Sequence, residues 1–129
     1  MERPRVVLAD DELQMRELVA ELLRFDCEIV GSVKNGEEAI EAVQELDPDV
    51  VVLDISMPVL NGFQVASRLR DSGCRAKVIF LSVHQDRDFI AAAYAVGAVS
   101  YVFKSHASAD LLPAIQSALQ GQTFASALK

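Results

Sequence analysis

The sequence has no tryptophan, only two cysteines and two histidines, and no long hydrophobic run. Cys27 and Cys74 are far apart and have no Cys-x-x-Cys spacing, so we expect reduced thiols rather than a disulfide or a metal centre. His84 and His106 form no ligand cluster, which argues against a zinc site. No apolar stretch approaches the roughly 18 residues of a membrane span, and the first residues lack a signal-peptide layout. We therefore expect a cytoplasmic protein with no membrane partner.

Basic residues are scarce relative to acidic ones. Twelve Lys and Arg residues against 19 Asp and Glu residues give a net charge of −7. A domain this acidic is a poor candidate for binding nucleic acid through phosphate contacts, so we expect no direct nucleic-acid contact. The length of 129 residues suits one domain, and the hydrophobic share of 51% suffices for a buried core.

Short apolar runs alternate with stretches of helical periodicity. Strands are expected at residues 5–9, 27–33, 50–53, 78–81 and 99–103, and helices at residues 12–24, 36–46, 61–70, 86–96 and 108–119. This alternation predicts an α/β fold in which helices cover both faces of a parallel sheet. Pro113 fits the last helix only near its first turn, so Ser108 or Asp110 is the expected N-cap.

Polar side chains gather where the predicted strands end. In an open parallel sheet, ligands bind outside the carboxyl ends of the strands, which lie at one edge. The polar residues at these ends are Asp10, Asp11, Asp54, Ser82 and Lys104. Taken singly, each is typical of a helix cap, a turn or a solvated surface. Their coincidence at one edge of the sheet favours a functional site.

The charges of these residues indicate a particular chemistry. Three carboxylates held together repel one another, and a divalent cation relieves that repulsion. Mg²⁺ prefers a few carboxylates plus water and leaves positions open for phosphate oxygens. A lysine ammonium and a serine hydroxyl suit the same oxygens. An aspartate at a strand end is then a candidate nucleophile that accepts a phosphoryl group as an acyl phosphate.

The pattern resembles the receiver domains of bacterial two-component response regulators, from residue 6 to about residue 121. The resemblance implies a doubly wound, flavodoxin-like sheet of five parallel strands in the order 2-1-3-4-5. It divides the chain into a receiver domain at residues 1–121 and the start of a linker at residues 122–129. The motifs that carry it are Asp10-Asp11, Leu53-Asp54-Ile55-Ser56-Met57-Pro58, Asn61-Gly62, Ser82 and Tyr101-Val102-Phe103-Lys104.

The resemblance also implies a phosphoryl site with a Mg²⁺ cofactor. Asp54 would be the phosphoacceptor. The metal would be held by Asp10, Asp11, Asp54 and the backbone carbonyl of Ser56.

A switch is implied as well. Lys104 and Ser82 would contact the phosphoryl oxygens, and the Ser82 hydroxyl would move toward the phosphoryl group as Tyr101 turns inward. These changes would remodel the face made by the fourth helix, fifth strand and fifth helix. Many receivers have a cis proline after the lysine. Ser105 stands there in this chain, and a cis bond before a non-proline residue costs about 3 kcal/mol.

The segment from Tyr101 to Ser105, with Leu111, Leu112, Ile115 and Gly121, looks most like receivers joined to LuxR-type helix-turn-helix output domains. This implies a sensor histidine kinase as phosphoryl donor and dimerisation on phosphorylation. DNA would be bound through an output domain that this chain does not contain, for the regulation of transcription.

Other functions fit the residues less well. A receiver is a switch that catalyses only its own phosphorylation and dephosphorylation, not a metabolic enzyme. A phosphatase of the haloacid-dehalogenase type needs a second aspartate two residues after the nucleophile, where Ser56 stands. A degenerate receiver that only binds partners would not need the whole acidic, hydroxyl and lysine set. A flavin-binding module would need a phosphate loop after the first strand.

Overall fold

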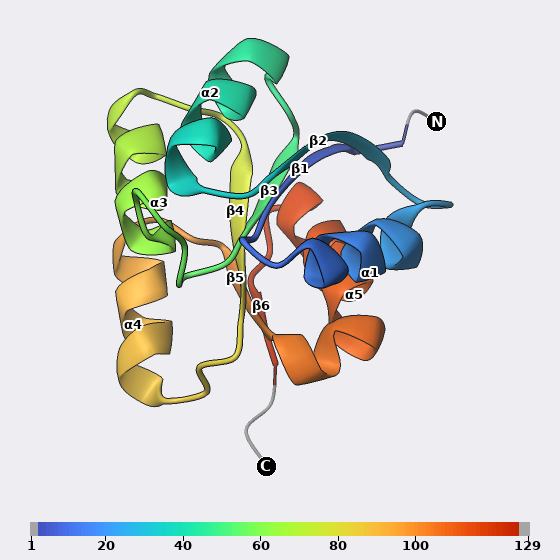
Figure 1. The fold of residues 1–129 in the computed structure, drawn as a ribbon. Helices are drawn as coiled ribbons and strands as arrows, with labels where there is room; N and C mark the ends of the chain where they lie inside the picture. Colours follow the sequence, from blue (N-terminus) through green and yellow to red (C-terminus); the bar gives the residue numbers. More distant parts are fainter. Residues whose placement is uncertain (1–2, 127–129) are drawn as a thin grey trace.

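The computed structural model describes residues 3–126, and one sheet between two layers of helices organises this part of the chain (Figure 1). The strands are β1 (Arg5–Ala9), β2 (Glu28–Val33), β3 (Val50–Leu53), β4 (Lys77–Ser82), β5 (Ser100–Phe103) and β6 (Phe124–Ala125). The helices are α1 (Leu13–Leu23), α2 (Gly36–Leu46), α3 (Gly62–Asp71), α4 (Arg87–Ala95), α5 (Ala107–Leu119) and a 3-10 turn, η1 (Lys104–His106).

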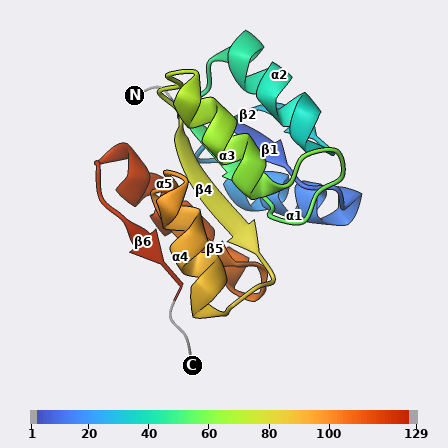
Figure 2. The same cartoon turned by 90° about the vertical axis from the view of Figure 1, so that its left-hand side faces the viewer.

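All neighbouring strands pair in parallel, in the order β2-β1-β3-β4-β5-β6. This confirms the doubly wound α/β fold and the 2-1-3-4-5 order, with one strand more than the five expected. The additional strand, β6, lies beside β5 at the edge of the sheet (Figure 2). It falls in the segment predicted to begin a linker, and the last linker residues, 127–129, lie outside the described residues.

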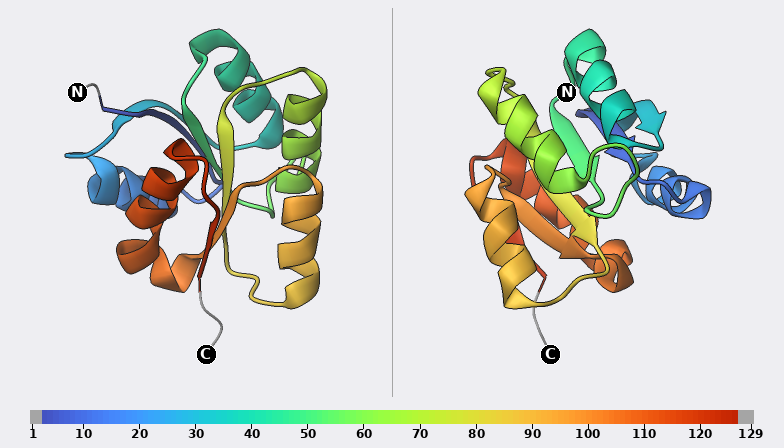
Figure 3. Two further views of the ribbon diagram at one scale, coloured as in Figure 1. Left: turned by 180° about the vertical axis from the view of Figure 1, so that it is seen from behind. Right: turned by 60° about the vertical axis from the view of Figure 1, so that its left-hand side comes forward.

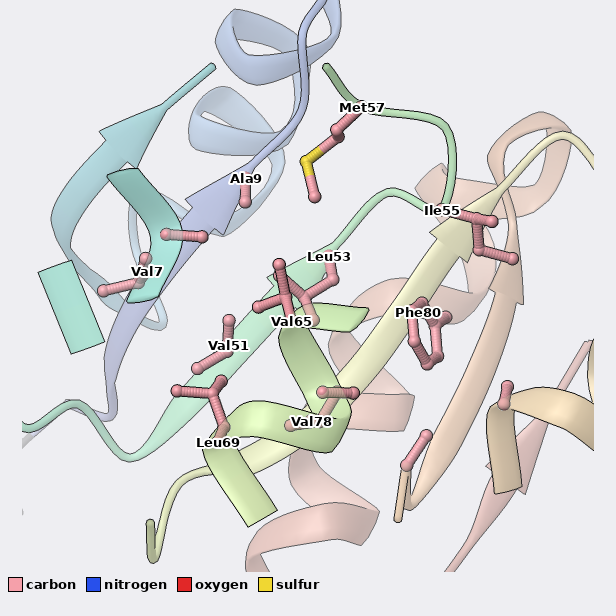
Figure 4. Packing of buried hydrophobic residues seen from close by; sticks show 14 of the residues in the cluster. Val7, Ala9, Val51, Leu53, Ile55, Met57, Val65, Leu69, Val78 and Phe80 are labelled. Carbon is pink, nitrogen blue, oxygen red and sulfur yellow. The ribbon is translucent and has the colours of Figure 1, made fainter. Parts of the chain in front are cut away.

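Alternating side chains of the central strands fill two separate cores. In β1, Val7 belongs to the cluster under α2, α3 and α4, whereas Val6 belongs to the cluster under α1 and α5. All four residues of β3 are buried because helices cover both faces of the sheet (Figure 3). Figure 4 shows Val51, Leu53 and Phe80 pointing into the first of these clusters. The continuous apolar runs in the sequence are thus the signature of two-sided burial.

The start of α5 differs from the prediction. Its N-cap is His106, so the expectation that Ser108 or Asp110 caps this helix is wrong. The preceding turn η1 runs directly into α5, and the Ala107 amide donates to the Lys104 carbonyl, so no side-chain cap is needed there. Pro113 is accommodated inside the helix rather than in its first turn.

Three smaller expectations concern the covalent chain and its environment. Cys27 and Cys74 are free thiols. Every peptide bond within residues 3–126 is trans, including the bond between Lys104 and Ser105. Across the same residues, each helix is too short or too polar to cross a lipid bilayer.

Candidate functional site

The lysine predicted from the fifth strand meets the acidic residues that follow the first and third strands. Lys104 Nζ lies 2.8 Å from Asp10 Oδ2, 3.2 Å from Asp54 Oδ2 and 3.3 Å from Glu12 Oε1. Asp10 and Asp54 are each only 5% exposed. The structure therefore brings together three strand ends that are far apart in the sequence, as the topology predicts.

Backbone hydrogen bonds beyond the strand ends hold the two buried carboxylates in place. The Asp54 amide donates to the Ala9 carbonyl at 2.9 Å, and the Asp10 amide donates to the Val33 carbonyl at 3.1 Å. The Ile55 amide donates to Asp54 Oδ1 at 2.8 Å. One oxygen of Asp54 is thereby oriented by the backbone, while the other, Oδ2, faces the Lys104 ammonium.

Gly62 brings the first turn of α3 against the loop that carries Asp54. Its amide donates to the Ile55 carbonyl at 2.8 Å. A Cβ atom at this position would lie 2.3 Å from the Asp54 carbonyl oxygen and 2.8 Å from the Phe80 ring. Only glycine permits this approach, which gives the Asn61-Gly62 motif a steric reason beside the capping box that Asn61 forms with Gln64.

Charges are crowded at this end of the sheet. Burial, followed by the nearby Asp10 carboxylate, raises the pKa of Asp54, and Lys104 only partly opposes this. Burial alone would lower the pKa of Lys104, but its contacts with Asp10 and Asp54 outweigh burial and raise it. The ammonium is therefore firmly protonated, and two buried carboxylates share it.

The arrangement fits a hard divalent cation. Asp10, Asp11 and Glu12 each offer a carboxylate oxygen within 4.8 Å of the others. Among the described residues no hydrogen bond of acceptable geometry reaches Asp10 Oδ2, although the Lys104 ammonium lies 2.8 Å away. An all-oxygen donor set that includes a buried carboxylate suits Mg²⁺. Asp54 and Ser56, predicted as ligands, lie outside this group of three.

The predicted switch residues meet at the loop between β4 and α4. Ser82 and Tyr101 are both fully buried, so Tyr101 already occupies the inward position that the resemblance implies for the phosphorylated chain. The His84 amide donates to Ser82 Oγ at 3.1 Å, and the Tyr101 hydroxyl donates to the His84 carbonyl at 2.8 Å. Burial raises the pKa of the Tyr101 phenol. The ring of His84 stacks on Phe89 with centroids 4.0 Å apart, and its Nε2 lies 3.4 Å from Ser56 Oγ.

Two contacts at this site were missed by reasoning from the sequence. Glu12 joins the acidic group and contacts Lys104, which its position next to Asp10-Asp11 could have indicated. Arg16 Nη1 donates to the Asp10 carbonyl at 2.7 Å. No local pattern marks that contact, because it depends on how α1 packs against the end of β1.

Known proteins place the chain in a family. Residues 6–116 match the family model described as the response regulator receiver domain. The chain therefore belongs to the family of response regulator receiver domains, which confirms the resemblance inferred from its motifs.

The relatives include regulators of several kinds. The nitrate/nitrite response regulator NarL of Escherichia coli K12 is 32% identical over 123 residues, covering 94% of this chain and 57% of NarL. A protein-glutamate methylesterase/protein-glutamine glutaminase of Syntrophomonas wolfei is 40% identical over 107 residues, covering 81% of this chain but 30% of that protein. The chain thus spans only part of the length of these relatives.

Solved structures give the same fold and subfamily. A LuxR-family two-component response regulator from Aurantimonas sp. SI85-9A1 superposes with a TM-score of 0.90 at 30% identity, over 95% of this chain and 89% of that chain. A signal receiver domain from Mycobacterium tuberculosis superposes with a TM-score of 0.91 at 29% identity, covering 95% and 100% of the two chains. The chain is a receiver of the LuxR/NarL type.

Proposed function

We propose that this chain is a phosphorylation switch in which Asp54 accepts a phosphoryl group from a sensor histidine kinase. The observation that carries the proposal is the placement of Asp54, which is buried at the carboxyl end of β3 within 3.2 Å of the Lys104 ammonium. Mg²⁺, held by the neighbouring carboxylates, would neutralise charge on the transferring group.

The residues of the chain have distinct roles in this reaction. A carboxylate oxygen of Asp54 forms the new P–O bond while the bond between phosphorus and the donor's histidine nitrogen breaks, and a proton from water neutralises the departing imidazole. Lys104 pairs with the phosphoryl oxygens once Asp54 Oδ2 carries the phosphoryl group or has turned away from the ammonium. Asp10 and Asp11, with Asp54 and the Ser56 carbonyl, would hold the metal, and the Glu12 carboxylate lies close enough to Asp10 and Asp11 to contribute.

The switch begins with a change of charge. Phosphorylation replaces the −1 of Asp54 with about −2. Ser82, the last residue of the neighbouring strand β4, carries the one hydroxyl of that strand, and this hydroxyl turns toward the new oxygens. His84 links Ser82 to Tyr101 through its amide and carbonyl, so a movement of this loop reaches β5 and the α4-β5-α5 face. That face would mediate dimerisation of phosphorylated chains.

The output would be transcription, controlled in the cytoplasm through a DNA-binding domain that follows the receiver. The similarity to NarL over 94% of this chain and to a LuxR-family regulator over 95% of it supports this output. On this proposal residues 1–121 form the receiver, β6 completes its sheet, and the chain beyond β6 leads toward the output domain.

The decisive experiment is labelling with acetyl phosphate, a small phosphodonor. The unaltered chain is expected to be labelled in a Mg²⁺-dependent manner, and a chelator should abolish the labelling. Asp54→Asn removes the nucleophile and should leave no label, whereas Asp26→Asn, at an exposed position, should label normally. Undiminished labelling of Asp54→Asn would refute the assignment. Continuous hydrolysis of a phosphate ester would favour a phosphatase instead.

A further inference from the structure

Ser126 is a buried serine just beyond β6, and none of the roles above uses it. Only 6% of the residue is exposed. The preceding residues of β6 pair with β5, Phe124 opposite Ser100 and Ala125 opposite Tyr101. The back view in Figure 3 and the view in Figure 2 both place this short strand along the edge of β5, between α4 and α5.

The side chain of Ser126 bonds to two separate elements. Its Oγ accepts a hydrogen bond from the Phe103 amide at 3.1 Å and donates one to Asp110 Oδ2 at 2.6 Å. Its own amide donates to the Tyr101 carbonyl at 2.9 Å. The hydroxyl therefore uses both its acceptor and its donor capacity. It gives the buried Phe103 amide a hydrogen-bond acceptor.

The two partners of this hydroxyl flank Lys104. Phe103 is the residue immediately before Lys104 and is only 1% exposed. Asp110 belongs to α5, which follows the 3-10 turn Lys104–His106 directly. The Ser126 hydroxyl therefore links the residue before the turn that carries Lys104 to the first turn of the helix that follows it. The backbone bond from the Ser126 amide to the Tyr101 carbonyl pairs β6 with β5 without the hydroxyl, whereas the bonds to Phe103 and Asp110 depend on it.

We infer that Ser126 is a positioning residue for Lys104, which it serves by bracing the backbone from which the lysine side chain extends. The inference rests on the proposed function, in which Lys104 pairs with the phosphoryl oxygens. In the structure the ammonium is held by Asp10, Asp54 and Glu12. Those ion pairs rearrange when Asp54 receives a phosphoryl group, whereas a backbone brace stays in place during the transfer.

The test compares the initial rate of Mg²⁺-dependent labelling by acetyl phosphate in variants of the full chain. Ser126→Ala should lower the rate about 3- to 10-fold, less than the roughly 100-fold that a 1 Å misplacement of a reacting group can cost. Ser126→Thr keeps the hydroxyl and should restore most of the rate. Ser108→Ala, at an exposed position on α5, is the matched control and should label normally. Wild-type labelling by Ser126→Ala would overturn the inference.

A double-mutant cycle separates positioning from a general structural role. In a Lys104→Ala background, removing the Ser126 hydroxyl should cause no further loss of labelling, because the group it positions is already gone. An equal further loss in that background would contradict the inference. The Mg²⁺ concentration that gives half of the maximal rise in melting temperature should also be the same in Ser126→Ala and the unaltered chain. The reason is that Ser126 contacts no proposed metal ligand. A shift in this concentration would count against positioning.

A measurement without phosphodonor distinguishes this inference from the proposed function. Hydrogen exchange of the Phe103 amide should accelerate in Ser126→Ala and remain slow in Ser126→Thr. Unchanged exchange in Ser126→Ala would overturn the brace whatever the labelling result. If the unaltered chain is not labelled but exchange is accelerated in Ser126→Ala, the proposed phosphorylation of Asp54 is refuted. The support that Ser126 gives to the Phe103 backbone would then still stand. Should Ser126→Ala fail to fold, Asp110→Ala removes the acceptor side and should show the same pattern more weakly.

Discussion

The body of the sheet and its carboxyl end are built on opposite principles. In the body, Val51 and Ile79 are fully buried and gain stability from desolvation. At the carboxyl end of the same strands, the carboxylates of Asp10 and Asp54 are nearly as buried, yet the raised pKa of Asp54 means that its ionised form is disfavoured there. The difference teaches that the body stabilises the fold, whereas the end gives up stability to concentrate charge for chemistry.

The largest expected effect lies in the body. Phe80→Ala removes a fully buried ring that lies 5.5 Å from Phe63 and 6.4 Å from Tyr101, centroid to centroid. It should lower the free energy of unfolding by about 3–5 kcal/mol in a denaturant titration. Phe25→Ala, at a ring whose residue is 77% exposed, is the control and should change stability little. Equal losses in the two variants would remove the distinction between core and surface on which the comparison rests.

An intermediate effect is expected where the two regions meet. Gly62→Ala forces a Cβ against the Asp54 carbonyl and the Phe80 ring, so it should destabilise the chain by about 1–3 kcal/mol and also slow labelling of Asp54. Gly73→Asn is the control, because Gly73 has open space around it and a φ of +77° that asparagine tolerates. A Gly62→Ala variant that keeps both stability and labelling would show that the close approach is unimportant.

The smallest expected effect lies at the charged end and has the opposite sign. Without Mg²⁺ at neutral pH, Asp54→Asn should be more stable than the unaltered chain by roughly 1 kcal/mol, because it removes a disfavoured buried charge. The folded pKa of Asp54 is raised, so its favourable contribution is present below the unfolded pKa and is lost as pH rises through the folded pKa. The gap between the two proteins should therefore open as pH rises. Thermal unfolding from acid to neutral pH measures it, and a less stable Asp54→Asn at neutral pH would contradict the comparison.

The body of the sheet was readily predicted because its pattern is strong. The predicted bounds of β1, β3 and α2 agree with the structure. A short run of β-branched and apolar residues such as Val50-Val51-Val52-Leu53, placed between two helical patterns, favours a buried strand over a helix. The meeting of Asp10, Asp54 and Lys104 was also predictable, because parallel topology alone brings these strand ends to one edge.

Features that depend on single long-range contacts could not be predicted. Strand β6 has two residues and no periodicity, and it is held by the Tyr94 hydroxyl, which donates to the Phe124 carbonyl, and by Ser126. Asp110 was expected to cap α5 because an aspartate near a helix start usually does. It instead accepts the Ser126 hydroxyl, a partner 16 residues away that no local rule identifies.

The two tyrosines give this chain a built-in optical readout. With no tryptophan to dominate the emission, the near-ultraviolet spectrum arises chiefly from Tyr94 and Tyr101. The Tyr94 hydroxyl is bonded to the carbonyl of Phe124 in β6, and the Tyr101 hydroxyl to the carbonyl of His84 beside the phosphoryl site. The Tyr94 phenol therefore reports on the attachment of β6, and the Tyr101 phenol reports on the loop that the reaction moves. Tyrosine absorbance or fluorescence can follow both without an attached dye.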